Sequence, residues 1–451
     1  MKLSQLFLIV AIVYFPSSAA FAQSCLTDTC HSQLTEFKAP HSPSADGDCL
    51  ACHRQTTNDH PRPGGKTFEL IQEGAGLCRQ CHPFIAEKKF VHAPVKQGRC
   101  LACHQPHGGA DRFLLNDRDD VSSLCLGCHP DTTRQGGNIH GPFASGACSQ
   151  CHSPHDSEQE GLLRLPPRQL CLRCHADFAR ELREARIVHP PVTDSPCTSC
   201  HAPHASEAGF LLNESMPELC IGCHGEIGRI LAEAVHQHGP TRDAKGCGNC
   251  HSTHFSQTKG LLPLREKDLC FECHSRGRLG EPALEAIEKE LNKAKVAHGP
   301  LQDGKCAPCH NPHGSDHFRM LVDHFPEPSY FPYDATAYAL CLRCHDQGML
   351  RQEEQEPPTR FRDGERNLHA VHSADRQKGR SCRFCHPPHV SDSAKLINTD
   401  GVAFGEWKIP IRLQLSPAGG SCAPGCHKPL SYNREKQENP WNRQQDLFKR
   451  R

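Results

Sequence analysis

Side chains that normally build a hydrophobic core are scarce in this sequence. Of the 451 residues only 6% are aromatic, and all hydrophobic residues, cysteine included, make up 37%. A chain of this length has room for about two to four ordinary domains, but such a composition fills their interiors thinly. A conventional side-chain core is therefore not expected.

Several other features are absent, and each absence excludes a class of function. Basic and acidic residues number 51 each, so the net charge does not indicate a charged partner. The sequence also lacks the combination of aromatic and basic residues that is typical of nucleic-acid binding. No stretch after residue 22 is long and apolar enough to span a bilayer. No phosphate loop, nicotinamide fingerprint or catalytic acid–base constellation is visible. We therefore expect no nucleic-acid partner and no transmembrane segment in the mature chain.

Residues 1–22 have the features of a secretory signal peptide. Lys2 precedes an apolar run over 6–15, and an A-x-A cleavage site follows at 20–22. The run is too short to cross a membrane, so the segment predicts export. We expect the mature chain to begin near Gln23 and to lie in the periplasm or outside the cell.

Cysteine and histidine are in excess, with 30 and 33 residues. Every cysteine belongs to a close pair, and a histidine follows every pair at once. Thirteen pairs have the spacing C-x-x-C-H, and two are stretched, as CLTDTCH and CAPGCH. The pairs are Cys25 and Cys30, Cys49 and Cys52, Cys78 and Cys81, Cys100 and Cys103, Cys125 and Cys128, Cys148 and Cys151, Cys171 and Cys174, Cys197 and Cys200, Cys220 and Cys223, Cys247 and Cys250, Cys270 and Cys273, Cys306 and Cys309, Cys341 and Cys344, Cys382 and Cys385, and Cys422 and Cys426. The histidines after them are His31, His53, His82, His104, His129, His152, His175, His201, His224, His251, His274, His310, His345, His386 and His427.

The spacing C-x-x-C-H is the attachment motif of c-type haem. Two thiols add to the vinyl groups of one haem, and the adjoining histidine can reach its iron as proximal ligand. Disulfides explain an even number of cysteines but not the histidines, and zinc ribbons do not require a histidine after every pair. The repetition favours haem over both alternatives. It predicts about fifteen covalently attached haem c groups with their iron, one for each cysteine pair.

The motifs recur in seven tandem repeats of two motifs each. Their first cysteines are at positions 49, 100, 148, 197, 247, 306 and 382; we number the repeats 1 to 7 in this order. The predicted organisation is a signal peptide (1–22), an N-terminal CxxxxCH haem segment (23–40), regular doubled repeats (41–274), a helix-containing insertion with the sixth haem pair (275–345), a charged linker (346–371), and a C-terminal haem pair with a basic tail (372–451).

Fourteen further histidines recur at regular places in the repeats. Seven lie upstream of the first cysteine of a repeat, at His41, His92, His140, His189, His238, His298 and His372. Seven lie downstream of the first motif, at His60, His107, His155, His204, His254, His313 and His389. We expect all fourteen to be second axial iron ligands; the spacing does not decide which histidine serves which iron.

Methionine cannot be a general alternative ligand, because only Met216, Met320 and Met349 remain after residue 22. Low reduction potentials are therefore expected. Four histidines have no regular place, namely His236, His317, His324 and His369. One of them could serve the haem at Cys25, and the others are expected to be ordinary solvated or hydrogen-bonded imidazoles.

About thirty residues of chain are available for each cysteine pair, so we expect haem to replace the side-chain core and the porphyrins to lie close together. The predicted fold is mainly irregular with short α-helices and little or no β-sheet, as an elongated tandem array. Apolar residues at helical spacing predict helices within 168–191, 216–240 and 281–300.

The motifs resemble those of multihaem cytochromes c with doubled C-x-x-C-H motifs, in the class of cytochrome c3-like and periplasmic multihaem cytochromes. The resemblance covers residues 41–427. It rests on CLACHQPH (100–107), CSQCHSPH (148–155), CTSCHAPH (197–204), CAPCHNPH (306–313) and CRFCHPPH (382–389). Two repeats depart from it, since Thr253 replaces proline and repeat 1 has its next histidine only at His60. The resemblance implies redox partners such as periplasmic cytochromes, a quinol dehydrogenase or an outer-membrane conduit.

Two functions remain open at this point. The protein is either a carrier that relays electrons to a protein or extracellular acceptor, or a reductase of a small nitrogen or sulfur oxyanion. A reductase needs at least one iron with an open or displaceable axial position. The supply of extra histidines favours the carrier, so we expect an electron-transfer protein rather than an enzyme. The oligomeric state is left open.

Overall fold

The computed structural model describes residues 25–27, 30–116, 121–129, 137–243, 245–275, 286–351, 359–404 and 406–436. The expected signal peptide and the tail 437–451 lie outside these ranges, as do parts of the segments 275–297 and 346–371. The chain divides into two compact units, Met1–Arg180 with Ser195–Glu214 and Glu181–Asp194 with Ser215–Arg451. Within the described ranges, no helix is long and apolar enough to cross a membrane.

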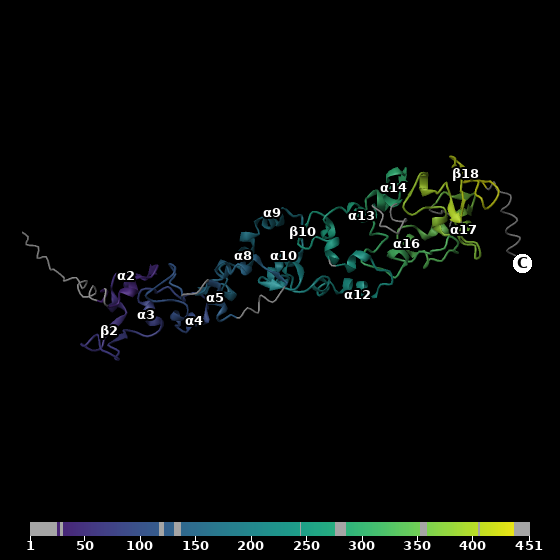
Figure 1. Ribbon diagram of the computed structural model, residues 1–451. Helices are drawn as coiled ribbons and strands as arrows, with labels where there is room; N and C mark the ends of the chain where they lie inside the picture. Colours follow the sequence, from purple (N-terminus) through teal and green to yellow (C-terminus); the bar gives the residue numbers. More distant parts are fainter. Residues whose placement is uncertain are drawn as a thin grey trace, which may run out of the picture. The chain divides into compact units, whose positions relative to one another are not determined.

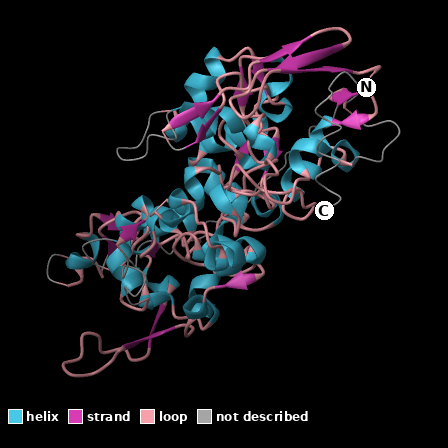
Figure 2. Cartoon of the chain, turned by 90° about the vertical axis from the view of Figure 1, so that its right-hand side faces the viewer, coloured by secondary structure: helices cyan, strands magenta, loops and turns pink. Residues whose placement is uncertain are grey.

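Short helices and irregular loops make up most of the described chain (Figures 1 and 2). This confirms the mainly irregular fold with short helices. The α-helices are α2 (Ser42–Ala45), α3 (Ala75–Arg79), α4 (Ala93–Lys96), α5 (Val121–Leu126), α6 (Gly141–Ala144), α7 (Cys148–Cys151), α8 (Pro167–Cys174), α9 (Ala176–Glu184), α10 (Pro190–Asp194), α11 (Glu218–Ile221), α12 (Gly225–Glu233), α13 (Glu266–His274), α14 (Ala286–Lys293), α15 (Gly299–Gln302), α16 (Ala339–Leu342) and α17 (Leu368–Ser373).

Helices recur at two places in the repeats: at the second motif and directly after the upstream histidine. Helices α3, α5, α8, α11, α13 and α16 carry the first cysteine of a second motif. Helices α2, α4, α6 and α15 begin directly after an upstream histidine, which is their N-cap, and each has proline at its first or second position. Proline suits this place because the first turn of a helix leaves its N–H groups unpaired. The H-x-P pattern therefore sets the upstream histidine at the start of a short helix.

The strands are short and antiparallel. They are β1 (Ala39–Pro40), β2 (His53–Gln55), β3 (Phe68–Leu70), β4 (Phe90–Val91), β5 (Gly108–Gly109), β6 (Asn138–Ile139), β7 (Asp156–Ser157), β8 (Ile187–Val188), β9 (Ala205–Ser206), β10 (Phe255–Ser256), β11 (Val296–Ala297), β12 (Arg362–Asp363), β13 (Arg366–Asn367), β14 (Val390–Ser391), β15 (Val402–Phe404), β16 (Trp407–Ile409), β17 (Leu413–Leu415), β18 (Gly419–Cys422) and β19 (Leu430–Asn433).

Five two-residue ladders follow one rule. Each pairs the residues before an upstream histidine with the residues after the downstream histidine of the next repeat, as in β1–β5, β4–β7, β6–β9, β8–β10 and β11–β14. In repeat 5, His236 forms a single bridge with Ser315 at the equivalent place. In repeats 1 to 6 this strand pairing therefore holds the upstream histidine beside a downstream histidine about one repeat further along the chain.

Residues 359–436 differ from the rest of the chain. They form the hairpins β12–β13 and β15–β16 and the three-stranded sheet β17–β18–β19. The sequence does not predict these strands, because proline and glycine interrupt their apolar residues. Buried side chains concentrate here and just before, and include Tyr338, Phe384 and Tyr432 at 1%, 3% and 6% exposure. Among the described residues, the large side chains that are almost fully buried therefore gather in and just before repeat 7.

Candidate functional site

The first-motif histidines of repeats 2 to 7 are each held by a backbone carbonyl nine residues later. His104 donates from Nδ1 to Phe113 O at 2.9 Å, and His152 donates to Gly161 O at 2.8 Å. A carbonyl oxygen only accepts, so Nδ1 must carry the proton and Nε2 is left with a free lone pair. Such a bond orients a metal-binding imidazole. The same contact joins His201 to Phe210, His251 to Gly260, His310 to Arg319 and His386 to Lys395.

The accepting carbonyls belong to turns with left-handed backbone. Gly161 and Gly260 have φ of 66° and 78°. Phe210, Arg319 and Lys395 adopt the same conformation at 58°, 55° and 60° although they are not glycine. Non-glycine residues in this region are strained and occur where the surrounding structure requires them. Here the left-handed backbone points the carbonyl oxygen toward the histidine.

The upstream histidines are held across the repeat boundary. His41 donates from Nδ1 to Pro106 O at 2.8 Å, and its backbone N–H donates to His107 O at 2.9 Å. His189 donates to Thr253 O at 2.9 Å in the same way, so the departure from proline leaves the contact intact because the acceptor is a backbone carbonyl. The corresponding Nδ1 bonds run from His92 to Pro154, from His140 to Pro203 and from His238 to Pro312.

The motif histidines face other histidines at a constant spacing of 5.8 to 6.3 Å between ring centroids. A metal lies about 2 Å from a coordinating imidazole nitrogen, and that nitrogen lies about 1 Å from the ring centre, so two imidazoles on one metal have centroids about 6 Å apart. The residues present therefore fit an iron between each pair. The pairs are His31 with His60, His41 with His82, His53 with His107, His92 with His129, His104 with His155, His140 with His175, His152 with His204, His189 with His224, His238 with His274, His251 with His313, His298 with His345 and His310 with His389.

These pairs obey two rules that the sequence left open. An upstream histidine faces the second-motif histidine of its own repeat, as His92 faces His129. A downstream histidine faces the first-motif histidine of the preceding repeat, as His155 faces His104. His60 of repeat 1 consequently faces His31. This differs from the expectation that an irregular histidine serves the Cys25 motif.

In repeat 7, one of the four histidines without a regular place in the sequence faces a motif histidine. His369 faces His386 at 6.4 Å, with the ring planes 24° apart. The signal that was available is the pattern LHAVH (368–372), which puts two histidines three residues apart on α17. His317 and His324 lie edge to face at 4.3 Å, away from this spacing. His201 and His254 belong to different compact units.

Burial lowers the pKa of some of the facing histidines, among them His107, His155 and His204. It is the main reason why the pKa of His107 lies below its ordinary value, and the nearby His53 adds to the effect. Burial first and His104 second likewise lower the pKa of His155. A lowered pKa favours the neutral imidazole at pH 7, which is the form that binds a metal.

The cysteines are free thiols that approach one another in chain order. Cys49 lies against Cys25, Cys78 against Cys100, and Cys125 against Cys148. Cys171 and Cys197, Cys270 and Cys306, and Cys341 and Cys382 repeat the contact. Each of these contacts joins the first cysteines of two successive motifs. Among the described residues, no group of three or more His, Cys, Asp or Glu side chains is placed to hold a bare metal ion.

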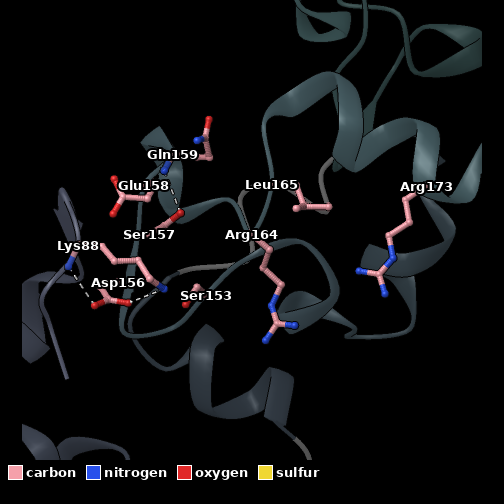
Figure 3. A pocket seen from close by; sticks show the side chains of 9 residues that line it. All are labelled: Lys88, Ser153, Asp156, Ser157, Glu158, Gln159, Arg164, Leu165 and Arg173. Carbon is pink, nitrogen blue, oxygen red and sulfur yellow. Dashed lines mark hydrogen bonds and ion pairs between the residues drawn. The ribbon is translucent and has the colours of Figure 1, made fainter. Parts of the chain in front are cut away.

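A shallow polar cavity lies beside the motif at 171–175 (Figure 3). Asp156 and Lys88 form an ion pair at 3.1 Å on one side. Arg164 and Arg173 line the other side, with their guanidinium groups pointing the same way (Figure 3). Paired guanidinium groups suit carboxylates, which haem carries as propionates. The cavity therefore places two cationic side chains beside this motif.

A comparison with family models gives one match, to the doubled CXXCH motif, at residues 41–87, 92–134, 140–180, 189–229, 238–279 and 298–350. Together these segments cover more than half of the chain. They correspond to repeats 1 to 6 and include their upstream histidines. No curated protein matches the chain significantly.

Proposed function

Because the chain belongs to the doubled CXXCH motif family and is a multihaem c-type cytochrome, we propose that it relays electrons through about fifteen covalently attached haems, one at each of its fifteen cysteine pairs. Each bound haem supplies an iron that takes up and releases one electron. The chain supplies two thiols and one histidine from each motif, and a second histidine from elsewhere. We propose the bis-histidine pairs described above as the axial ligands.

The pairing of imidazoles is the observation that carries this proposal. A reductase of a small oxyanion requires an iron whose axial position is open or easily displaced. In the described part of the chain, the twelve regular pairs and the pair of His369 with His386 give thirteen motif histidines a facing imidazole. The Cys25 motif, the best candidate for an open site, is among them. Occupied axial positions favour a relay over catalysis.

The order of the cysteine contacts supports a linear route. In the first compact unit, Cys25 is followed by Cys49, and Cys78 by Cys100. In the second compact unit, Cys270, Cys306, Cys341 and Cys382 follow the same order, and Cys385 is close to Cys422. Groups bound to neighbouring cysteines are neighbours themselves, so within each unit electrons would pass between successive motifs along the sequence.

Location and partners are proposed from the sequence. The signal-peptide features of residues 1–22 support export to the periplasm, or further to the cell surface. We propose redox proteins or an extracellular acceptor as partners, among them periplasmic cytochromes, a quinol dehydrogenase or an outer-membrane conduit. Intact mass of the secreted protein tests the export and the haem count, because it gives the cleavage position and the number of haems. A mature mass with fewer than thirteen haems would contradict the haem count.

The relay is tested by rapid mixing. Fully reduced protein is mixed separately with nitrite, hydroxylamine, sulfite or tetrathionate, and with a soluble ferric chelate or a partner cytochrome. We expect fast oxidation only by the chelate and the cytochrome, because the small substrates find no open iron. Multi-turnover reduction of a small substrate that is abolished by altering one haem motif would place the protein among the reductases instead.

A further inference from the structure

The first motif of repeat 7 departs from the rule that governs repeats 1 to 6. In those repeats, the described partners of first-motif histidines come from the following repeat, as His389 faces His310. His386 instead faces His369, which lies before it in its own repeat. The separation of 6.4 Å and the plane angle of 24° match the regular pairs. The difference is therefore in the source of the second imidazole and not in the geometry.

We infer that α17 supplies both second axial ligands of repeat 7: His369 for the motif Cys382–Cys385–His386 and His372 for the motif Cys422–Cys426–His427. The inference deepens the proposed function and rests on it, since it requires haem at both motifs. It makes repeat 7 independent of any following repeat. It also gives the segment 346–371 a ligand-bearing role in place of that of a charged linker.

His372 is held by contacts of its own. Its ring stacks on Phe361 at 5.9 Å with an angle of 18°, and Nδ1 donates to Leu368 O at 2.6 Å. An upstream histidine faces the second-motif histidine of its own repeat, as His92 faces His129. By this rule, His372 is assigned to the motif of His427.

Buried polar contacts hold His369 in position. Asn367, which is 2% exposed, caps α17 by accepting from the His369 N–H at 3.0 Å. The Asn367 amide nitrogen donates to Met349 O and Arg351 O at 2.8 and 2.9 Å. The Thr359 hydroxyl bonds Nδ1 of His369 at 2.9 Å. A histidine held at both its backbone and Nδ1 leaves Nε2 for the iron.

Helix spacing explains how one short helix serves two motifs. Residues three apart on a helix are neighbours on its surface, so His369 and His372 project beside each other. The two motifs are also adjacent, since Cys385 lies close to Cys422. Two ligands on one helix therefore meet two neighbouring motifs without a contribution from another repeat.

The test uses the full-length secreted protein with all haems attached. We expect His369→Ala to convert one haem in fifteen from low-spin to high-spin in the electron paramagnetic resonance spectrum of the oxidised protein. The reduced variant should bind one carbon monoxide per molecule. His372→Ala should give the same two readouts. The matched control is His317→Ala, which removes a histidine outside the pairs and should leave the spectrum unchanged.

Double variants identify the haem that loses its ligand. Adding Cys382→Ser and Cys385→Ser removes the first haem of repeat 7, so it should abolish the high-spin signal of His369→Ala and leave that of His372→Ala. Adding Cys422→Ser and Cys426→Ser should have the reverse effect. If His369→Ala leaves the electron paramagnetic resonance spectrum unchanged, the assignment is wrong. It is also wrong if the high-spin signal of His369→Ala survives the loss of the Cys382 haem.

A conservative variant separates ligation from a structural role. His369→Met keeps an axial ligand, so the haem should remain low-spin while its potential rises, because a methionine ligand favours the reduced iron. Global misfolding would instead change the spectra of many haems, and such a result would count against the assignment. High-spin or missing haem in the wild type would contradict the proposed function itself, whereas a low-spin wild type with a silent His369→Ala variant contradicts only this inference.

Discussion

Asp156 shows how a single side chain can join distant parts of the array. It is 7% exposed, and its carboxylate accepts from the N–H groups of Glu87 and Lys88 and pairs with the Lys88 ammonium at 3.1 Å. Burial alone would raise the pKa of Asp156, but the bonds from Lys88 and Glu87 outweigh it and hold the pKa below the ordinary value of 3.8. The charged form is therefore favoured by folding.

We predict that Asp156→Asn loosens the contact between β4 and β7. Hydrogen bonds to a charged group contribute about 1.5–3 kcal/mol, so the local free energy of opening should fall by about that amount. Hydrogen exchange of the peptide with residues 87–91 at pH 7, followed by mass spectrometry, measures it. The control is Asp177→Asn, because the Asp177 carboxylate is 84% exposed in its pair with Arg180 and exposed pairs contribute little.

The sign of the pH dependence follows from the lowered pKa of Asp156. The folded value lies below 3.8, so the stabilisation is present above that pH and is lost as the pH falls through the folded pKa. The difference between wild type and Asp156→Asn should therefore be full at neutral pH and disappear in strong acid. An unchanged difference down to that range would contradict the role of the carboxylate.

Among the elements, the left-handed turns are the local structure on which the first-motif histidines depend. In repeat 3 the 3₁₀ turn Glu160–Leu162 contains Gly161, whose φ is 66° and whose carbonyl accepts from His152. In repeat 4 the turn Gly209–Leu211 begins with Gly209, which is outside the left-handed region. An added Cβ would meet open space at both glycines. An alanine at either position therefore meets no steric clash, and only at Gly161 does it enter the left-handed region.

We predict that Gly161→Ala is destabilising and that Gly209→Ala is not. A side chain in the left-handed region costs about 1–2 kcal/mol, and relief of that strain would move the carbonyl away from His152. The expected results are a lower thermal midpoint and altered low-spin g-values for one haem. Equal behaviour of the two variants would show that the turn does not depend on its left-handed backbone.

For the whole molecule, the absence of methionine ligands sets the expected range of potentials. Methionine raises the potential of a c-type haem relative to a second histidine, and the described histidine pairs leave no general place for it. We predict that a spectroelectrochemical titration shows many overlapping one-electron steps at negative potentials. A distinct step at positive potential in the wild type would mean that some haem has another ligand, and ligand-specific spectra would identify it.

Much of the site could be predicted because it is local in the sequence. Fifteen pairs of cysteines with adjoining histidines predict the attachment points and proximal ligands, because covalent attachment depends on residues only a few positions apart. The helices around the second motifs, such as α8 and α12, were also predictable from apolar spacing. The β17–β18–β19 sheet was not, since its short strands carry too few alternating residues to separate them from loops.

The pairing of the imidazoles was decided by tertiary structure alone. His53 has histidines on both sides in the sequence, and spacing allows several of them, yet the ladders across repeat boundaries bring His107 to it. His369 is irregular in spacing and becomes a partner of His386 because α17 and the buried Asn367 place it there. The sequence by itself determined that haem is attached through doubled C-x-x-C-H motifs. Only the fold decided which imidazoles face each other, because that depends on strand pairing between residues tens of positions apart.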